Sequence, residues 1–175
     1  MVLLRDVQGR VYKFKSRSEC LGLGVLTLDV TDIVRSHMVL VVDIVPGKVD
    51  YVKVMTITST LKDDGDYVPI SPTPKKGYAI QLRLRNYHEG HHRDAARLIP
   101  ILPKYSYLKI DSSYEVPIQM LVEGLYCLGN PLMTWPKHQG GLGELRDHVR
   151  RRDLTRKKEE LYCTTDDQSE EEDGV

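Results

Sequence analysis

The stretch MVLVVDIVPGKVDYVKVMTITST, from Met38 to Thr60, decides the fold class. Its first part, Met38 to Val45, is a continuous apolar run of strand length that is rich in β-branched residues, and Pro46 and Gly47 end it with a turn signal. Its second part, Tyr51 to Thr60, consists almost entirely of residues that favour strands. Two strands joined by a short turn are therefore predicted.

Further strand signals follow at turn-punctuated intervals. Asp63 to Asp66 (DDGD) predicts a turn, and the prolines Pro69, Pro72 and Pro74 predict that the next segment is an edge strand or a strand exit rather than a central strand. Gly77 to Tyr87 alternates, with Tyr78, Ile80, Leu82 and Leu84 on one face and Ala79, Gln81, Arg83 and Arg85 on the other. YSYLKI and YEVPIQML continue the series to Ile118. With no helical pattern between them, these strands indicate a mainly β domain at 35–125, a small barrel or strongly bent sheet.

The segments around this domain have different characters. Residues 1–34 are expected to form an N-terminal β extension, with Val7 to Lys15 and Leu21 to Val34 as extended segments. Residues 126–143, rich in Gly and Pro, are expected to form a loop. Residues 144–162 predict a charged helix whose apolar stripe, including Leu145 and Val149, is thin. Residues 163–175 predict a disordered acidic tail.

Length and composition limit the class of protein. A chain of 175 residues with 41% hydrophobic residues can bury one core. No apolar run approaches the length needed to span a bilayer, and Arg5 and Asp6 interrupt the apolar stretch that a signal peptide needs. Cys20, Cys127 and Cys163 are far apart and form no C-x-x-C pair, so free thiols are expected. We therefore expect an intracellular protein, cytoplasmic or nuclear.

Charge is balanced overall and uneven locally. The formal net charge is zero, but Lys75 to Lys109 carries eight cations and two carboxylates (8 − 2 = +6) and Arg146 to Lys158 carries seven and two (7 − 2 = +5). The last ten residues carry six carboxylates and no cation. The clusters Arg150–Arg152 and Arg156–Lys158 are compatible with a nuclear localisation signal, a nucleic-acid contact or a solvated helix face. The acidic tail fits plain disorder, masking of a basic surface or partner binding.

One candidate binding site combines cations with aromatic rings. If the strands that carry them lie in one sheet, guanidinium groups and tyrosine rings share its solvent side, which suits phosphate contact and base stacking on single-stranded RNA. The alternative is an ordinary solvent-facing sheet surface, with arginine stems covering apolar groups. The residues of this predicted site are Arg83, Arg85, Tyr105, Tyr107 and Lys109.

No motif indicates a cofactor, a metal ion or a nucleophile. His88 to His92 holds three imidazoles and a carboxylate, which are zinc-competent ligands, but the tract is short and has no second ligand cluster elsewhere. An exposed polar loop is the expectation there. A nucleophile elbow, a phosphate loop and the H-E-x-x-H motif are all absent from the sequence.

Several blocks, in order, resemble the MazF/PemK family of toxin endoribonucleases. RSHMVLVVDI (Arg35 to Ile44) is similar to that family's opening strand, and GKVDYVKVMTITS (Gly47 to Ser59) to its second strand. YVPISPT (Tyr67 to Thr73) and PKYSYLKIDSSYEVPIQML (Pro103 to Leu121) are similar to its later segments. The resemblance implies a small SH3-like barrel and, for the family, cleavage of single-stranded RNA.

The chain departs from the family at the catalytic positions. Where the family has an Arg-Pro step that protonates the leaving group and holds the phosphate, this sequence has Asp50 and Tyr51. A carboxylate there would repel the scissile phosphate. The family's threonine near the third strand has no counterpart in Asp63 to Asp66. We therefore expect no catalytic residues and a binding module, with RNA as the leading partner. A protein-interaction or assembly module, including a homodimer, and a residual endoribonuclease with a rearranged site are the alternatives.

Overall fold

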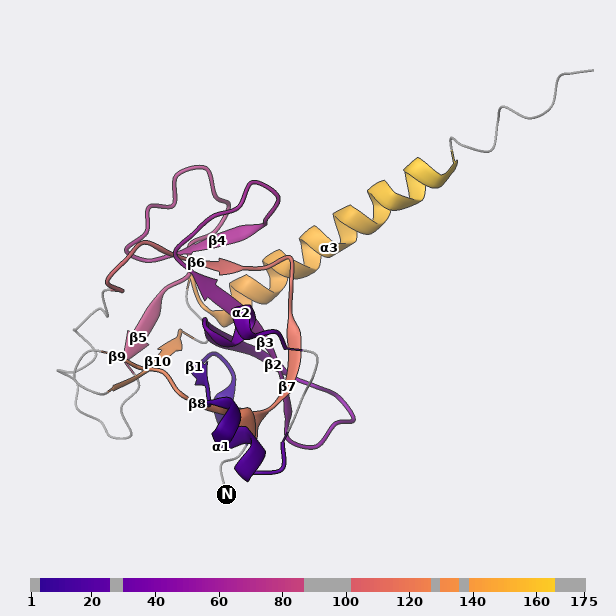
Figure 1. The fold of residues 1–175 in the computed structure, drawn as a ribbon. Coiled ribbons are helices and arrows are strands. Elements are labelled where there is room, and N and C mark those ends of the chain that lie inside the picture. The colour runs from indigo at the N-terminus through magenta and orange to yellow at the C-terminus, as the bar shows by residue number, and fades with distance from the viewer. Residues whose placement is uncertain (1–3, 26–29, 87–101, 127–129, 136–138, 166–175) are drawn as a thin grey trace, which may run out of the picture.

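The computed structural model describes residues 4–25, 30–86, 102–126, 130–135 and 139–165, and it is mainly β with a long C-terminal helix (Figure 1). The strands are β1 Val11–Phe14, β2 Met38–Ile44, β3 Tyr51–Thr58, β4 Tyr67–Ile70, β5 Leu84–Asn86, β6 Ser106–Lys109, β7 Tyr114–Pro117, β8 Leu121–Glu123, β9 Leu125–Tyr126 and β10 Asn130–Thr134. The helices are α1 Arg17–Gly22, α2 Asp32–Arg35 and α3 Leu142–Thr165, with 3-10 turns η1 Leu4–Val7 and η3 Ile118–Met120. The expected class is confirmed.

The strands form two antiparallel sheets. The larger has the order β4-β6-β3-β2-β1-β8, and β7 also pairs with β3, beside the first residues of that strand. The smaller has the order β5-β10-β9. Isolated bridges from Arg10 to Met133 and from Ile70 to Leu82 link the two. The larger sheet is open, with β4 and β8 at its ends, rather than closed into the expected barrel. The edge position predicted for the proline-containing strand β4 is confirmed.

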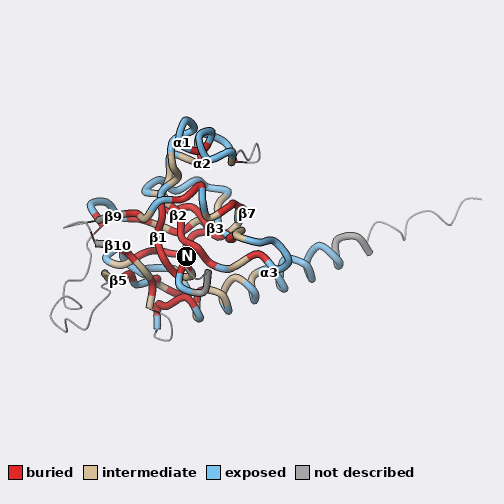
Figure 2. The backbone as a smooth tube through the Cα atoms, turned by 90° about the horizontal axis from the view of Figure 1, so that it is seen from below, coloured by how far each residue is buried: buried red, intermediate tan, exposed pale blue. Residues whose placement is uncertain are grey.

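Two hydrophobic clusters lie on opposite faces of β2. Leu40 and Val42 belong to the cluster shared with the smaller sheet and with the start of α3. Val39 and Val41 belong to the cluster under the N-terminal segment. Figure 2 shows this buried centre in red. Because both faces of β2 are covered, its sequence is a continuous apolar run instead of an alternating one.

The N-terminal segment is part of the larger sheet. β1 lies between β2 and β8, as expected for an extended segment. The expectation that Leu21 to Val34 is extended is wrong for its described parts, which contain the end of α1 and most of α2. The Ser16 hydroxyl accepts from Glu19 N, and the Glu19 carboxylate accepts from Ser16 N at 2.8 Å. This capping box starts a helix that the alternation pattern did not reveal.

The C-terminal region differs from its expected boundaries. The segment 126–143, expected as a loop, contains β10. Helix α3 starts at Leu142 and continues to Thr165, past both expected ends. Its first half packs on the larger sheet, whereas its second half projects beyond the sheets and is exposed (Figures 1 and 2). No helix in the described part of the chain is long and apolar enough to cross a membrane.

Some expectations fall on residues outside the described ranges. These are the histidine tract His88 to His92, Cys127, the side chain of Cys163 and the acidic segment 166–175. Cys20 is described, and it is a buried free thiol. Among the described residues, no group of three or more His, Cys, Asp or Glu side chains could hold a metal ion.

Candidate nucleic-acid interface

The five residues of the predicted site lie in two different sheets. Arg85 is in β5 of the smaller sheet, and Arg83 immediately precedes that strand. Tyr107 and Lys109 are in β6 of the larger sheet, and Tyr105 immediately precedes it. The condition for the predicted site, that one sheet carries all five residues, is therefore not met. The two groups have different surroundings, and each is described by itself.

The two arginines hold the segment that leads into α3. The guanidinium group of Arg85 lies 4.8 Å from the centre of the Trp135 ring, a cation–π contact. Arg83 N donates to Gly140 O at 2.8 Å. Gly140 has φ +79°, and a Cβ atom there would lie 2.5 Å from Gln81 O and 2.9 Å from Arg83 Cγ, so only glycine fits. These contacts engage the side chain of Arg85 and the backbone of Arg83, whereas the Arg83 side chain is exposed.

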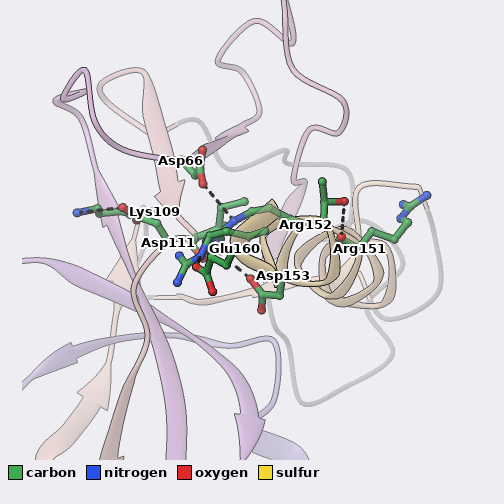
Figure 3. A network of polar contacts seen from close by, with 10 residues as sticks. Asp66, Lys109, Asp111, Arg151, Arg152, Asp153 and Glu160 are labelled. Carbon is green, nitrogen blue, oxygen red and sulfur yellow. Dashed lines mark hydrogen bonds and ion pairs between the residues drawn. The ribbon is translucent and has the colours of Figure 1, made fainter. Parts of the chain in front are cut away.

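Lys109 has an acidic neighbour. Its Nζ lies 3.6 Å from Asp111 Oδ2, and the Lys109 side chain is 30% exposed (Figure 3). An anionic ligand would therefore meet a cation whose charge is partly balanced.

The tyrosines of β6 belong to an aromatic group. The ring of Tyr107 lies 6.4 Å from that of Tyr67, edge to face, and 6.0 Å from that of Tyr78. Tyr67 is buried, and its hydroxyl accepts from Lys62 N at 3.0 Å. Tyr105 directly precedes the first residue of β6, and it is 61% exposed. Pairs at these separations favour fixed ring positions, so Tyr107 is held while Tyr105 faces solvent.

A buried threonine attaches the loop after β4 to the start of β6. Thr73 Oγ1 donates to Ser106 O at 3.0 Å and accepts from Ser106 N at 2.8 Å, and Thr73 is fully buried. Exposed Lys75 and Lys76 follow Thr73 within three residues, and exposed Lys104 precedes Ser106 by two. The contact of Thr73 with Ser106 therefore places the backbone that leads to Lys75 and Lys76 beside the start of β6, where Lys104 directly precedes Tyr105.

We call this surface the lysine–tyrosine face, and its residues are Lys75, Lys76, Tyr78, Lys104, Tyr105 and Tyr107. Tyr105 and Tyr107 were predicted from the sequence. The other four were missed as site residues, although three of them contribute to the local excess of positive charge between Lys75 and Lys109. The contact between Thr73 and Ser106 groups these residues, and no signal in the sequence predicts that contact.

Asp50 lies far from this face. It precedes β3, beside the pairing with β7, whereas Tyr107 pairs with Thr58 at the other end of β3. The eight residues of β3 span about 25 Å. Asp50 has φ +61°, a conformation that aspartate tolerates better than most residues. The carboxylate that replaces the family's arginine therefore cannot repel a ligand on the lysine–tyrosine face.

The cations of α3 divide into anchored and exposed groups. Arg146 Nε donates to Val42 O at 2.9 Å, and Arg152 Nη1 donates to Ile110 O. Arg152 Nε also lies 3.1 Å from Asp66 Oδ2, an ion pair without hydrogen-bond geometry (Figure 3). Arg156 Nε pairs with Glu160 within the helix at 3.2 Å. The interpretation of the cluster Arg150–Arg152 as a solvated helix face therefore does not hold for Arg152.

His148 lies among these arginines. Partial burial, followed by the positive charges of Arg151 and Arg152, lowers the pKa of His148 below its usual value, against the opposing effect of Asp66 and Glu144. The imidazole is therefore neutral at pH 7 and adds no charge to the helix.

Comparisons of this chain with protein-family models, with curated proteins and with solved structures gave no match. The resemblance to the MazF/PemK family remains a prediction from the sequence.

Proposed function

We propose that this protein is a non-catalytic binding module that takes single-stranded RNA on the lysine–tyrosine face. The observation that carries the proposal is the attachment of the lysine-bearing loop to the start of β6 by Thr73, beside the exposed ring of Tyr105. An exposed ring offers a stacking surface to a base, and lysines beside it contact the phosphates.

The proposal moves the expected site. Arg85 lies over Trp135, Lys109 lies beside Asp111, and the exposed Arg83 precedes a strand of the other sheet. The cations assigned to phosphate contact are therefore Lys75, Lys76 and Lys104. The tyrosines keep the stacking role that the sequence suggested. Three lysines and one exposed ring predict weak binding with little base selectivity, because stacking accepts every base.

The test is fluorescence anisotropy with a labelled single-stranded RNA of about 12 nucleotides, within the range of site sizes for such surfaces. Tyr105→Ala is expected to weaken binding by about 5- to 100-fold, the loss of one stacked base. Tyr162→Ala is the matched control because Tyr162 is 74% exposed but lies on α3, and it should bind like the wild type.

A second pair of variants separates the two basic regions. Lys75→Ala with Lys76→Ala should weaken binding, whereas Lys157→Ala with Lys158→Ala on α3 should leave it unchanged. Equal losses in the two double variants would refute the lysine–tyrosine face as the site. Intact RNA after prolonged incubation is the expected result for a module without catalysis, and cleavage abolished by a substitution near β3 would favour the residual endoribonuclease.

A further inference from the structure

A groove lies beside α3, lined by residues of this helix and of β2 and β3. Its volume is about 340 Å³, and its apolar lining is formed by Val42, Met55, Leu145, Val149 and Leu154. Charged side chains lie among these apolar groups, including Lys53, Arg150, Asp153 and Lys157. A groove with this lining suits an amphipathic helix with charges of both signs.

The helix face that lines the groove continues onto the projecting half of α3. The lining residues recur at the spacing of one helix face, with Val149, Asp153 and Lys157 four residues apart. The same spacing continues to Glu160 and Leu161, beyond the sheets. Leu154 is 54% exposed and Leu161 is 68% exposed. One face of α3 therefore presents a groove in its first half and exposed leucines in its second half.

Charge is also segregated along α3. Arg146 to Lys158 has a net charge of +5, and Glu159 and Glu160 follow it directly. In an antiparallel pair of such helices, the acidic end of one copy lies beside the basic first half of the other. A second copy of this chain therefore complements the helix in charge.

We propose that two copies of this chain pair their α3 helices antiparallel about a two-fold axis midway between Asp153 and Lys157. Each projecting half then lies over the groove of the other copy. This register places Leu161 of one copy against Val149 of the other, Glu160 against Arg150, and Lys157 against Asp153. Each contact occurs twice, as two-fold symmetry requires.

The lengths agree with this arrangement. The projecting half from Asp153 to Thr165 and the part of α3 that lines the groove, Leu145 to Lys157, are each about 20 Å long. The β-sheet parts of the two copies lie at opposite ends of the helix pair, so they do not collide. Within one chain the Arg150–Asp147 pair is 3.7 Å long and exposed, which leaves Arg150 available to a second copy.

The test is sedimentation equilibrium of the full chain without RNA, at concentrations up to about 100 µM, which covers a weak and small interface. The wild type is expected to associate reversibly to a dimer. Leu161→Asp should raise the dissociation constant at least about tenfold, because it places a carboxylate in an apolar groove. Tyr162→Asp is the control because Tyr162 lies on the opposite face of α3. A wild type that stays monomeric throughout this range overturns the proposal.

A charge-reversal pair tests the register. Arg150→Glu alone and Glu160→Arg alone should each weaken the dimer, and the double variant should restore it, because the pair is re-formed with opposite polarity. Arg151→Glu, on the far face, serves as the control. Failure of the double variant to recover, or an equal effect of Arg151→Glu, overturns this register. Because no RNA is present, either result is independent of the RNA-binding proposal.

Discussion

The guanidinium group of Arg146 donates to the carbonyl oxygen of Val42, with Nε 2.9 Å from the oxygen. Val42 lies at a bulge, because Val41 pairs with Val54 and Asp43 with Lys53, which leaves no residue opposite Val42. A β-bulge exposes a carbonyl that the ladder does not satisfy, and Arg146 supplies the missing donor. The helix that projects from the protein is thus fixed to an irregularity in the central strand pair.

Arg146→Ala is expected to lower the free energy of unfolding by about 1–3 kcal/mol, because the Val42 carbonyl loses a charged donor. Urea denaturation followed by circular dichroism measures the change. Arg151→Ala is the control: Arg151 is exposed and donates only to a carbonyl within its own helix, so a change within about 0.5 kcal/mol is expected. Equal losses in the two variants would refute the anchoring role of Arg146.

Arg152 forms the second anchor, and its side chain is only 17% exposed. Arg152→Ala should lower the free energy of unfolding by about 2–3 kcal/mol, because the carbonyl of Ile110 loses its donor. Asp66 is 59% exposed, so Asp66→Asn should cost less than about 1 kcal/mol. A larger effect at Asp66 than at Arg152 would mean that the ion pair, and not the carbonyl, fixes the helix.

Thr73→Val tests the attachment of the lysine-bearing loop. Valine matches threonine in shape but leaves Ser106 N and O without the hydroxyl, so a loss of about 1–3 kcal/mol in the free energy of unfolding is expected. RNA affinity should fall as well, because Lys75 and Lys76 are no longer held beside Tyr105. Thr60→Val, at an exposed position, is the matched control. Unchanged stability and affinity would contradict the role given to Thr73.

His148 predicts a dependence of stability on pH. Its pKa is lowered in the folded protein, so below the ordinary value of about 6.5 the unfolded chain binds a proton that the folded chain does not. The stabilising contribution is therefore present above this pH and is lost as the pH falls. The urea midpoint should decrease between about pH 7.5 and about pH 5.5, and less steeply in His148→Gln. Identical slopes would show that His148 is not responsible.

Much of the fold could be predicted from local patterns. The apolar run of β2 indicates a strand covered on both faces, and Val39 to Val42 are buried. The alternation around Ile80, Leu82 and Leu84 gave the correct buried residues, although only Leu84–Asn86 is a strand. Burial follows the apolar side chains, whereas strand pairing also depends on partners far away in the sequence.

The candidate site was less accessible to sequence reasoning. Arg85 is fixed by Trp135, a residue 50 positions later, and the lysine-bearing loop is fixed by the contact of Thr73 with Ser106. Neither contact has a local signature. The sequence identified the types of side chain involved, aromatic and basic, and two of the tyrosines. The tertiary contacts determine which of the cations stay available to a ligand.

The salt dependence of RNA binding tests the central claim most directly. In the wild type, the logarithm of the association constant should fall linearly with the logarithm of salt concentration. In the triple variant Lys75→Ala, Lys76→Ala and Lys104→Ala, the slope should be smaller by about 2, since each phosphate contact to a single strand contributes about 0.7. Absence of binding at low salt, or the same slope in both proteins, would contradict RNA recognition by the lysine–tyrosine face.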